Sequence, residues 1–216
     1  MSVEMIQLPS HEEWLKHRKG YIGGSEAACI MGLNPWKSNL DLFREKTGKQ
    51  EAPDLSGNEA VEYGTKAEEH IRALFALDHP ELEVSYVPYN SWHNSKYPFA
   101  AASLDGWLKD GNGRKGIWEC KTAIITSKTQ AEKWKDQIPD YYYCQLLHYF
   151  GVTEFDFAIL RARLRYNYPY NSYVIERDYP FERSAYEADI ATIMGKEAVF
   201  HEQLKSGQEP PRKIIF

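Results

Sequence analysis

Cysteine is scarce in this 216-residue sequence, which contains only Cys29, Cys120 and Cys144. The three are odd in number and widely separated, and the sequence contains no Cys-x-x-Cys pair and no cysteine–histidine pairing. Such a set indicates neither a disulfide framework nor a zinc site. We therefore expect a protein that works in a reducing compartment.

Long apolar runs are missing as well. No segment approaches the roughly 20 apolar residues that a helix needs to cross a bilayer. The first segment, MSVEMIQLPSHEEWLKHRKG, has no apolar signal-peptide core. We therefore expect a cytoplasmic protein with no membrane partner.

There is no excess of positive charge. The sequence has 26 Lys and Arg against 31 Asp and Glu, which gives a formal net charge of −5 at pH 7. This argues against a surface coated with positive charge, so any nucleic-acid site must be a local basic stripe in one cleft. The aromatic share is 14%, with 15 Tyr. Such residues serve as core, as interface or as a stacking surface for bases, and composition does not choose among these roles.

The length and the composition, with 43% hydrophobic and 26% charged residues, predict a single globular domain over residues 1–216. A loop-like segment at residues 49–58 divides a helical N-terminal segment, residues 1–58, from the main body, residues 59–216. Apolar periodicity predicts helices at residues 25–33 with Ser25 as N-cap, 38–48 capped by Ser38 or Asn39, 59–77, 141–150 and 181–204. Alternation predicts strands at residues 83–89, 99–107, 116–121, 155–164 and 172–177. This order predicts an α/β fold with a central mixed β-sheet flanked by helices.

The segment SLDGWLKDGNGRKGIWECK, residues 103–121, brings charged residues together. The period of two in a strand places Glu119 and Lys121 on the same face, with Cys120 on the opposite, buried face. If Asp105 ends the preceding strand of a hairpin whose loop is 109–115, its carboxylate returns beside Glu119. Two acids and one amine then converge.

Two carboxylates held close together repel each other, and a divalent cation cancels that cost. Hard oxygen ligands such as Asp105 and Glu119 suit Mg²⁺ or Mn²⁺ rather than zinc. A bound cation of this kind supports phosphodiester hydrolysis. Lys121 then either directs its ammonium at the water or phosphate, or acts as a general base if burial depresses its pKa. The alternative to a catalytic site is an ordinary hairpin with an exposed pattern of cross-strand charges.

The same residues resemble the Asp…Glu-x-Lys core of the PD-(D/E)xK nucleases. Further segments resemble the phage lambda exonuclease branch, or YqaJ-type viral recombinases, of that superfamily. The matching segments are WLKHRKGYIGGSE, YGTKAEEHIRALF, LDGWLKDGNGRKGIWECK, YYYCQLLHYFGVT and YVIERD, and they cover about residues 14 to 195 in the family's order. The resemblance implies a restriction-endonuclease-like PD-(D/E)xK core.

The resemblance also implies a role for each matching residue. Asp105 and Glu119 are implied to bind Mg²⁺, together with the backbone carbonyl of Cys120. Three side chains are implied to position or activate the attacking water: Lys121, Gln145 and Glu68. The amide of Gln145 lies in the apolar stretch YYYCQLLHYF, where it needs a partner or a pocket. Glu68 taken alone is more typical of a solvated helix residue.

Arg18 and Ser25 are implied to hold the terminal 5′-phosphate of DNA. A guanidinium is a planar fork for phosphate, and a helix N-terminus is a ready anion site. Taken alone, Arg18 belongs to a basic run that is typical of a surface, and Ser25 is typical of an N-cap. The loop GLNPWKSN offers Lys37 to the DNA backbone. Trp36 is interpreted first as a core residue and second as a wedge or stacking group at the duplex end.

Other lysines, Lys128, Lys133 and Lys135, either line a DNA path or solubilise a loop. Leu104 stands where the family commonly has Pro before the Asp, which puts the rigidity of that approach in doubt rather than the chemistry. The three scattered cysteines do not provide the four that the related iron–sulfur nucleases need.

The resemblance implies a Mg²⁺-dependent 5′ to 3′ exonuclease that digests one strand of linear double-stranded DNA and leaves 3′ overhangs for recombination. It also implies a ring-shaped homotrimer and a single-strand annealing protein as partner, in a bacterial cell with a phage or prophage gene. An endonuclease or nickase with the same core, and a noncatalytic DNA-binding or annealing module, are the alternatives. Retention of both acids and Lys121 argues against the module.

Overall fold

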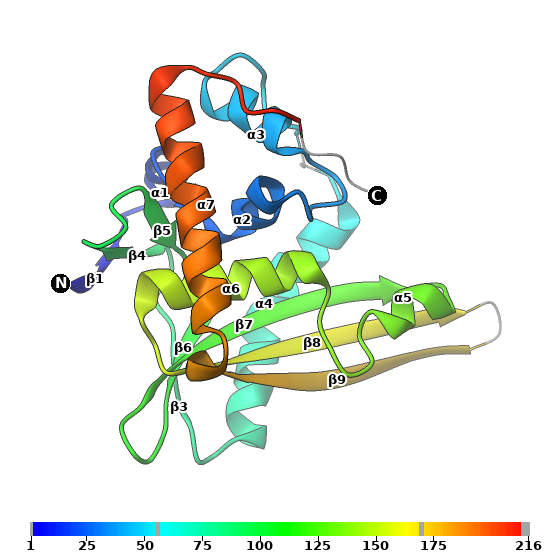
Figure 1. The fold of residues 1–216 in the computed structure, drawn as a ribbon. Coiled ribbons are helices and arrows are strands. Elements are labelled where there is room, and N and C mark those ends of the chain that lie inside the picture. Colours follow the sequence, from blue (N-terminus) through cyan, green and yellow to red (C-terminus); the bar gives the residue numbers. More distant parts are fainter. Residues whose placement is uncertain (1, 55–56, 169–170, 213–216) are drawn as a thin grey trace.

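A computed structural model of the chain describes residues 2–54, 57–168 and 171–212 (Figure 1). The helices are α1 (His11–Lys19), α2 (Gly24–Met31), α3 (Asn39–Lys46), α4 (Glu59–Asp78), α5 (Lys128–Glu132), α6 (Asp140–Thr153) and α7 (Glu187–Ser206). The strands are β1 (Val3–Gln7), β2 (Ile22–Gly23), β3 (Glu83–Ser85), β4 (Asn90–Asn94), β5 (Ala100–Ala102), β6 (Gly106–Lys109), β7 (Lys115–Ile125), β8 (Phe157–Tyr168) and β9 (Asn171–Glu182). No helix among these residues is long and apolar enough to cross a membrane.

The strands form two mixed sheets. The larger has the order β3-β6-β7-β8-β9, in which only β7 and β8 run parallel, and the smaller has the order β1-β4-β5-β2, in which only β2 and β5 run parallel. The prediction of an α/β fold with mixed strands and flanking helices is therefore confirmed, except that two sheets replace one central sheet. Strands β1 and β2 of the N-terminal segment pair with β4 and β5 of the main body, so the two segments share one sheet.

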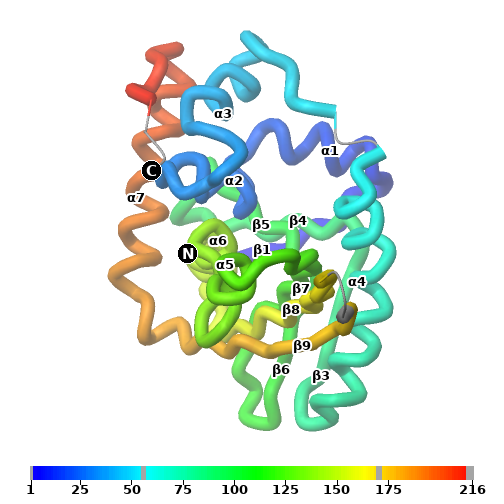
Figure 2. The backbone as a smooth tube through the Cα atoms, turned by 90° about the vertical axis from the view of Figure 1, so that its right-hand side faces the viewer, coloured from blue at the N-terminus to red at the C-terminus, as the bar shows by residue number. Residues whose placement is uncertain are grey.

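Helices cover both faces of the larger sheet (Figures 1 and 2). Ile117 of β7 belongs to the core beneath α6, whereas Trp118 and Cys120 pack with Ile71 and Phe75 of α4. The alternation along β7 is the predicted period of two, and it places Cys120 on the buried face opposite Glu119. A separate core joins α2, α3 and α7 and contains Cys29, Ile30, Leu42, Phe43 and Phe200.

Two predicted strands are interrupted in the structure. The strand predicted at residues 99–107 divides into β5 and β6, which lie in different sheets, because the chain leaves the extended ladder at residues 103–105. The strand predicted at residues 83–89 ends at Ser85, and residues 86–89 form a loop that leads to β4. Both interruptions border the candidate site described below.

Several element boundaries also differ from the prediction. Ser38 caps α3 as predicted, but α2 starts at Gly24 with Gly23 rather than Ser25 as its N-cap. The reason is that Glu26 accepts a hydrogen bond from the Gly23 N–H at 3.0 Å, which starts the helix earlier. The helix predicted at residues 181–204 begins only at Glu187, because β9 continues to Glu182. Elements β1, α1, β2, β4 and α5 were not predicted.

Candidate active site

Asp105 lies where strand β6 would otherwise extend along β7. The two strands form the predicted hairpin, but Asp105 precedes β6 instead of ending it as predicted. Gly106, the first residue of β6, pairs with Trp118. Two residues after Trp118 on β7, the Cys120 N–H donates a hydrogen bond to the Asp105 carboxylate, at 3.0 Å from Oδ2. The N–H and the carbonyl of one residue lie on the same edge of an extended strand. The Cys120 carbonyl therefore faces the same gap as the Asp105 carboxylate.

Asn90 holds the residue before Asp105. Its side-chain amide accepts from the Leu104 N–H at 2.9 Å and donates to the Leu104 carbonyl at 2.9 Å. Both groups are buried, so the amide acts as a substitute strand partner for Leu104. The approach to Asp105 is thus fixed without the proline that the family commonly has there, and a proline would lack this N–H.

Glu119 is only 1% exposed and has one unsatisfied oxygen. Its Oε1 atom receives the Lys121 ammonium at 2.7 Å and the Gln145 amide at 2.8 Å. Its Oε2 atom is buried and has no hydrogen-bond partner. The Gln145 amide also donates to the Tyr149 hydroxyl oxygen at 2.8 Å. Glu119 and Tyr149 are thus the partners that this polar side chain needs in the apolar helix α6.

Glu68 reaches the same place from α4 with the help of Arg72. The Arg72 guanidinium donates to the Glu68 carboxylate at 3.1 Å and to the Asp105 carbonyl at 2.6 Å. Arg72 was not predicted as a site residue. Arg72 follows Glu68 by four residues, which is the spacing of an ion pair on one face of a helix. This spacing was the feature of the sequence that could have identified Arg72.

Burial raises the pKa values of all three acids. Burial, reinforced by the Asp105 charge, raises the pKa of Glu119 to about 8 and that of Glu68 to about 7. Burial also raises the pKa of Asp105, although the Lys121 charge opposes this. For Lys121, burial alone would lower the pKa, but the Glu119 and Asp105 charges raise it above its ordinary value. The structure thus favours the ammonium form of Lys121 over the general-base alternative.

The donor set fits a hard divalent cation. Two close carboxylates, the orphaned Oε2 of Glu119 and the carbonyl of Cys120 are all oxygen donors. Among the described residues, no group of three His, Cys, Asp or Glu side chains is arranged to hold a metal ion. Mg²⁺ commonly binds to one or two carboxylates and keeps several waters, so this small donor set suits it.

Arg18 and Ser25 lie together as predicted. Arg18 Nη2 donates to Ser25 Oγ at 3.4 Å, and the guanidinium lies 4.5 Å from the ring centroid of Trp14. Trp14 in turn donates through Nε1 to Ser103 Oγ at 3.1 Å. The Arg18–Ser25 pair lies beside Gly24, the first residue of α2. The arrangement offers an anion a guanidinium, a hydroxyl and the N–H groups of a helix N-terminus.

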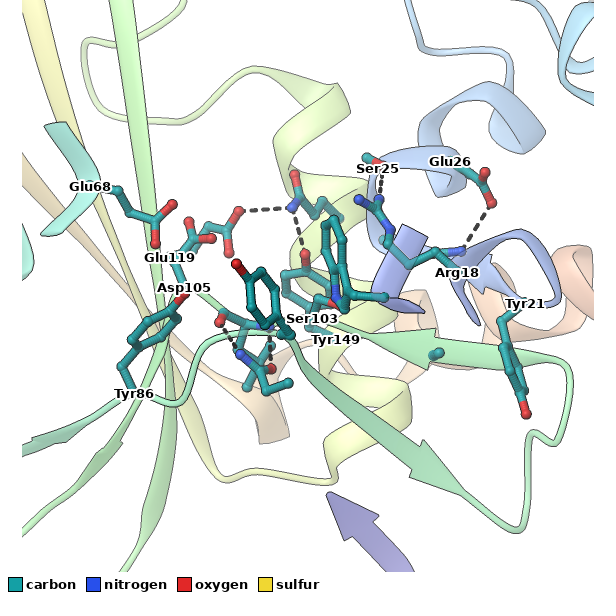
Figure 3. A pocket seen from close by; sticks show the side chains of 18 of the residues that line it. Arg18, Tyr21, Ser25, Glu26, Glu68, Tyr86, Ser103, Asp105, Glu119 and Tyr149 are labelled. Carbon is teal, nitrogen blue, oxygen red and sulfur yellow. Dashed lines mark hydrogen bonds between the residues drawn. The ribbon is translucent and has the colours of Figure 1, made fainter. Parts of the chain in front are cut away.

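One cavity of about 390 Å³ contains both groups of residues (Figure 3). Its lining includes the predicted residues Arg18, Ser25, Glu68, Asp105, Glu119, Lys121 and Gln145. It also includes residues that were not predicted, among them Trp14, Tyr86, Tyr89, Asn90, Ser103 and Tyr149. The seven predicted side chains thus come from four separate segments of the sequence and meet in one place.

The other predicted DNA contacts, Trp36 and Lys37, lie outside this cavity. Trp36 is 75% exposed, so its interpretation as a core residue is wrong. The Asn34 side chain accepts from the Trp36 and Lys37 N–H groups, and this turn directs the indole outward. Lys37 forms an ion pair with Glu45 at 2.6 Å. The lysines at 128, 133 and 135 are exposed and do not line the cavity.

The sequence matches the family model of the YqaJ-like viral recombinase domain over residues 13–156. The chain belongs to this family. It is 34% identical over 157 residues to the uncharacterized protein YqaJ of Bacillus subtilis (strain 168). That alignment covers 66% of the chain and 42% of the relative, so the chain spans less than half the length of the relative.

Two solved structures resemble the fold of this YqaJ-like domain. The alkaline exonuclease LHK-Exo from Laribacter hongkongensis has a TM-score of 0.63 at 18% identity, with 91% of this chain and 93% of that chain covered. A phage related exonuclease from Haemophilus somnus 129PT has a TM-score of 0.54 at 14% identity, with 87% and 96% covered. The likeness confirms the predicted PD-(D/E)xK-like fold.

Proposed function

We propose that this YqaJ-like protein is a Mg²⁺-dependent exonuclease. It digests one strand of linear double-stranded DNA in the 5′ to 3′ direction, releases mononucleotides and leaves 3′ overhangs. The family and the exonuclease names of the similar structures support a nuclease function. The strand polarity, the metal and the products are our proposal.

One observation carries the proposal: the acid pair and the Arg18–Ser25 pair line the same cavity. A phosphate held by Arg18 and Ser25 would place the end of a strand at a fixed distance from Asp105 and Glu119. Cleavage would then occur at the terminus rather than within the strand. An endonuclease would have no use for this second anion site.

The residues of the chain have separable roles in this proposal. Asp105, Glu119 and the Cys120 carbonyl would hold Mg²⁺, which would supply positive charge to the phosphate in the transition state. Gln145 and Lys121 occupy Oε1 of Glu119, which leaves Oε2 to the cation.

Two further groups would act on the reacting atoms. The Lys121 ammonium would add positive charge beside the phosphate. The Glu68 carboxylate, which Arg72 holds beside Asp105, would accept a hydrogen bond from the attacking water.

The experiment compares three DNAs in Mg²⁺: linear duplex with a 5′-phosphate, the same duplex with a 5′-hydroxyl, and a closed circle. Separate labels at the two ends of one strand report polarity. We expect loss of linear DNA only, fastest with the 5′-phosphate, from the 5′ end, and abolished by chelation of the metal.

Variants assign that activity to the site. Asp105→Asn retains the acceptor for the Cys120 N–H, so it should fold and lose hydrolysis. Asp136→Asn, at an exposed position outside the cavity, is the matched control. Cutting of the circle would identify an endonuclease instead, and binding without hydrolysis would identify a noncatalytic module.

The resemblance further leads us to propose a ring-shaped homotrimer and a single-strand annealing protein as partner. A ring would retain DNA topologically, so that a protein of net charge −5 needs positive charge only in its channel. Light scattering of the purified protein tests the trimer.

A further inference from the structure

The loop between β3 and β4 places two tyrosines in the cavity beside the acids. Tyr86 is 39% exposed and Tyr89 is 37% exposed, and both line the same cavity as Asp105 and Glu119. Figure 3 shows the Tyr86 ring next to Asp105 and Glu68. Large aromatic side chains of this kind usually lie in a core or an interface. Here two of them remain open to the space where the substrate would lie.

The Tyr86 ring is held in place through one of its faces. The Arg72 guanidinium lies 3.7 Å from the centre of that ring. Arg72 is itself fixed by its hydrogen bonds to the Asp105 carbonyl and to Glu68. The orientation of the ring is therefore tied to the acid that would hold the cation.

The backbone of Tyr89 is strained. Its φ of +57° lies in the left-handed region, which bulky residues rarely adopt. Two contacts impose it: the Leu8 N–H donates to the Tyr89 carbonyl, and the next residue, Asn90, is bound to Leu104 on both sides of its amide. Strain of this kind persists where the surroundings over-determine it, and it concentrates at ligand sites.

The rings, rather than the hydroxyls, are the functional part of these side chains. Among the residues that the structure describes, neither the Tyr86 hydroxyl nor the Tyr89 hydroxyl forms a hydrogen bond with another residue. A fixed aromatic surface that is partly exposed in the cavity suits a flat, aromatic ligand. A nucleobase is such a ligand, and stacking tolerates every base because each has a π-face.

We infer that Tyr86 and Tyr89 form a stacking wall for the nucleobase of a nucleotide that flanks the scissile phosphate. The choice of nucleotide rests on the proposed function, because it assumes that the phosphate lies at Asp105 and Glu119. The wall gives the substrate a third point of attachment, besides the acid pair and the Arg18–Ser25 pair. Because stacking tolerates every base, the wall would bind DNA of any sequence, as an enzyme that digests unselected DNA requires.

The first test measures stacking without catalysis. The probe is 2-aminopurine deoxyribonucleoside 5′-monophosphate, whose fluorescence is quenched when its base stacks. Wild type, Tyr86→Phe and Tyr89→Phe should quench it with the same Kd, and Tyr86→Leu and Tyr89→Leu should raise the Kd about ten-fold. Tyr173→Leu, at an equally exposed tyrosine outside the cavity, is the matched control and should bind as wild type. Unchanged binding by both Leu variants would overturn the inference.

The second test combines removal of a tyrosine ring from the protein with removal of a base from the DNA, as in a double-mutant cycle. Linear 5′-phosphorylated duplexes either are complete or lack the base of the first or of the second nucleotide. On complete DNA the Leu substitutions should lower kcat/KM about ten-fold. On the DNA that lacks the stacked base they should cost nothing further. An equal loss on all three DNAs would overturn the inference. Wild type that cleaves none of them would instead refute the proposed exonuclease, while nucleotide quenching would still decide on stacking.

Discussion

Gly24 lies against the ring of Tyr149 with no room for a side chain between them. A Cβ at Gly24 would overlap Cε1 of that ring and lie 3.0 Å from Cδ1 and Cζ. Gly24 starts α2, next to the Arg18–Ser25 pair, and the Tyr149 hydroxyl accepts from Gln145, which holds Glu119. This contact therefore sets the spacing between the proposed phosphate pocket and the acid pair.

Gly24→Ala should consequently affect both stability and activity. The ring of Tyr149 is buried and cannot move aside freely, so we expect a loss of about 1–3 kcal/mol in the free energy of unfolding. Hydrolysis of 5′-phosphorylated ends should fall more than the stability loss explains. The control is Gly195→Ala in α7, where a Cβ meets nothing within 4 Å and helix propensity predicts a gain of about 0.5–1 kcal/mol. Urea titrations of both variants check this, and equal effects at the two sites would refute the coupling.

Arg72 should prove necessary for the geometry of the acids. In Arg72→Met, the Asp105 carbonyl and the Glu68 carboxylate lose their shared donor, and the Tyr86 ring loses its cation. Displacement of a reacting group by about 1 Å costs on the order of 100-fold in rate, so kcat should fall by about that factor. Arg72→Lys keeps the charge but not the fork and should recover only part of it. Steady-state kinetics in Mg²⁺ provide the measurement, and full activity of the Met variant would contradict this role.

Asn90 should be one of the more costly positions to change. In Asn90→Ala the buried N–H and carbonyl of Leu104 lose their partners, and an unsatisfied buried group costs about 1–3 kcal/mol. We expect a loss of about 2 kcal/mol or more in the free energy of unfolding, together with reduced hydrolysis, since Leu104 positions Asp105. Asn112→Ala in the exposed hairpin loop is the matched control. A stability equal to that of wild type would show that water replaces the amide.

The hairpin that carries Asp105, Glu119 and Lys121 was predictable because its rules are local. The period of two fixes the face of each side chain on β7, and the short loop fixes which residues meet across the hairpin. The family resemblance added Glu68, Gln145, Arg18 and Ser25. The structure brings all of these into one cavity.

The surroundings of the hairpin were not predictable, because they depend on contacts between distant residues. Asn90 interrupts the strand expected at residues 99–107, since its amide replaces a strand as the partner of Leu104. Trp36 resembles a core residue by type, and only the turn at Asn34 shows that it points outward. Apolar periodicity carries no information on either contact.

The buried His148 should contribute to a dependence of the protein's stability on pH. Both ring nitrogens face acceptors, since Nδ1 lies 2.8 Å from Glu197 Oε1 and Nε2 lies 3.1 Å from the Ala101 carbonyl. A neutral imidazole has only one N–H, so both hydrogen bonds require the charged ring. Burial alone would lower the pKa of His148, but the Glu197 charge and hydrogen bond raise it above its ordinary value.

A raised pKa in the folded state means that protonation favours folding. The contribution of His148 is complete below the unfolded-state pKa of about 6.5 and is lost as pH rises through the higher folded-state pKa. The free energy of unfolding of wild type should therefore fall between mildly acidic and alkaline pH. Because the raised pKa values of Glu119 and Glu68 produce a slope of the same sign in this range, His148→Gln should remove only the share of the slope that His148 contributes. His70→Gln, at an exposed histidine of α4, should retain it. Urea titrations from pH 5.5 to 9 measure the three slopes. An equal slope in His148→Gln and wild type would mean that the buried pair does not titrate with folding.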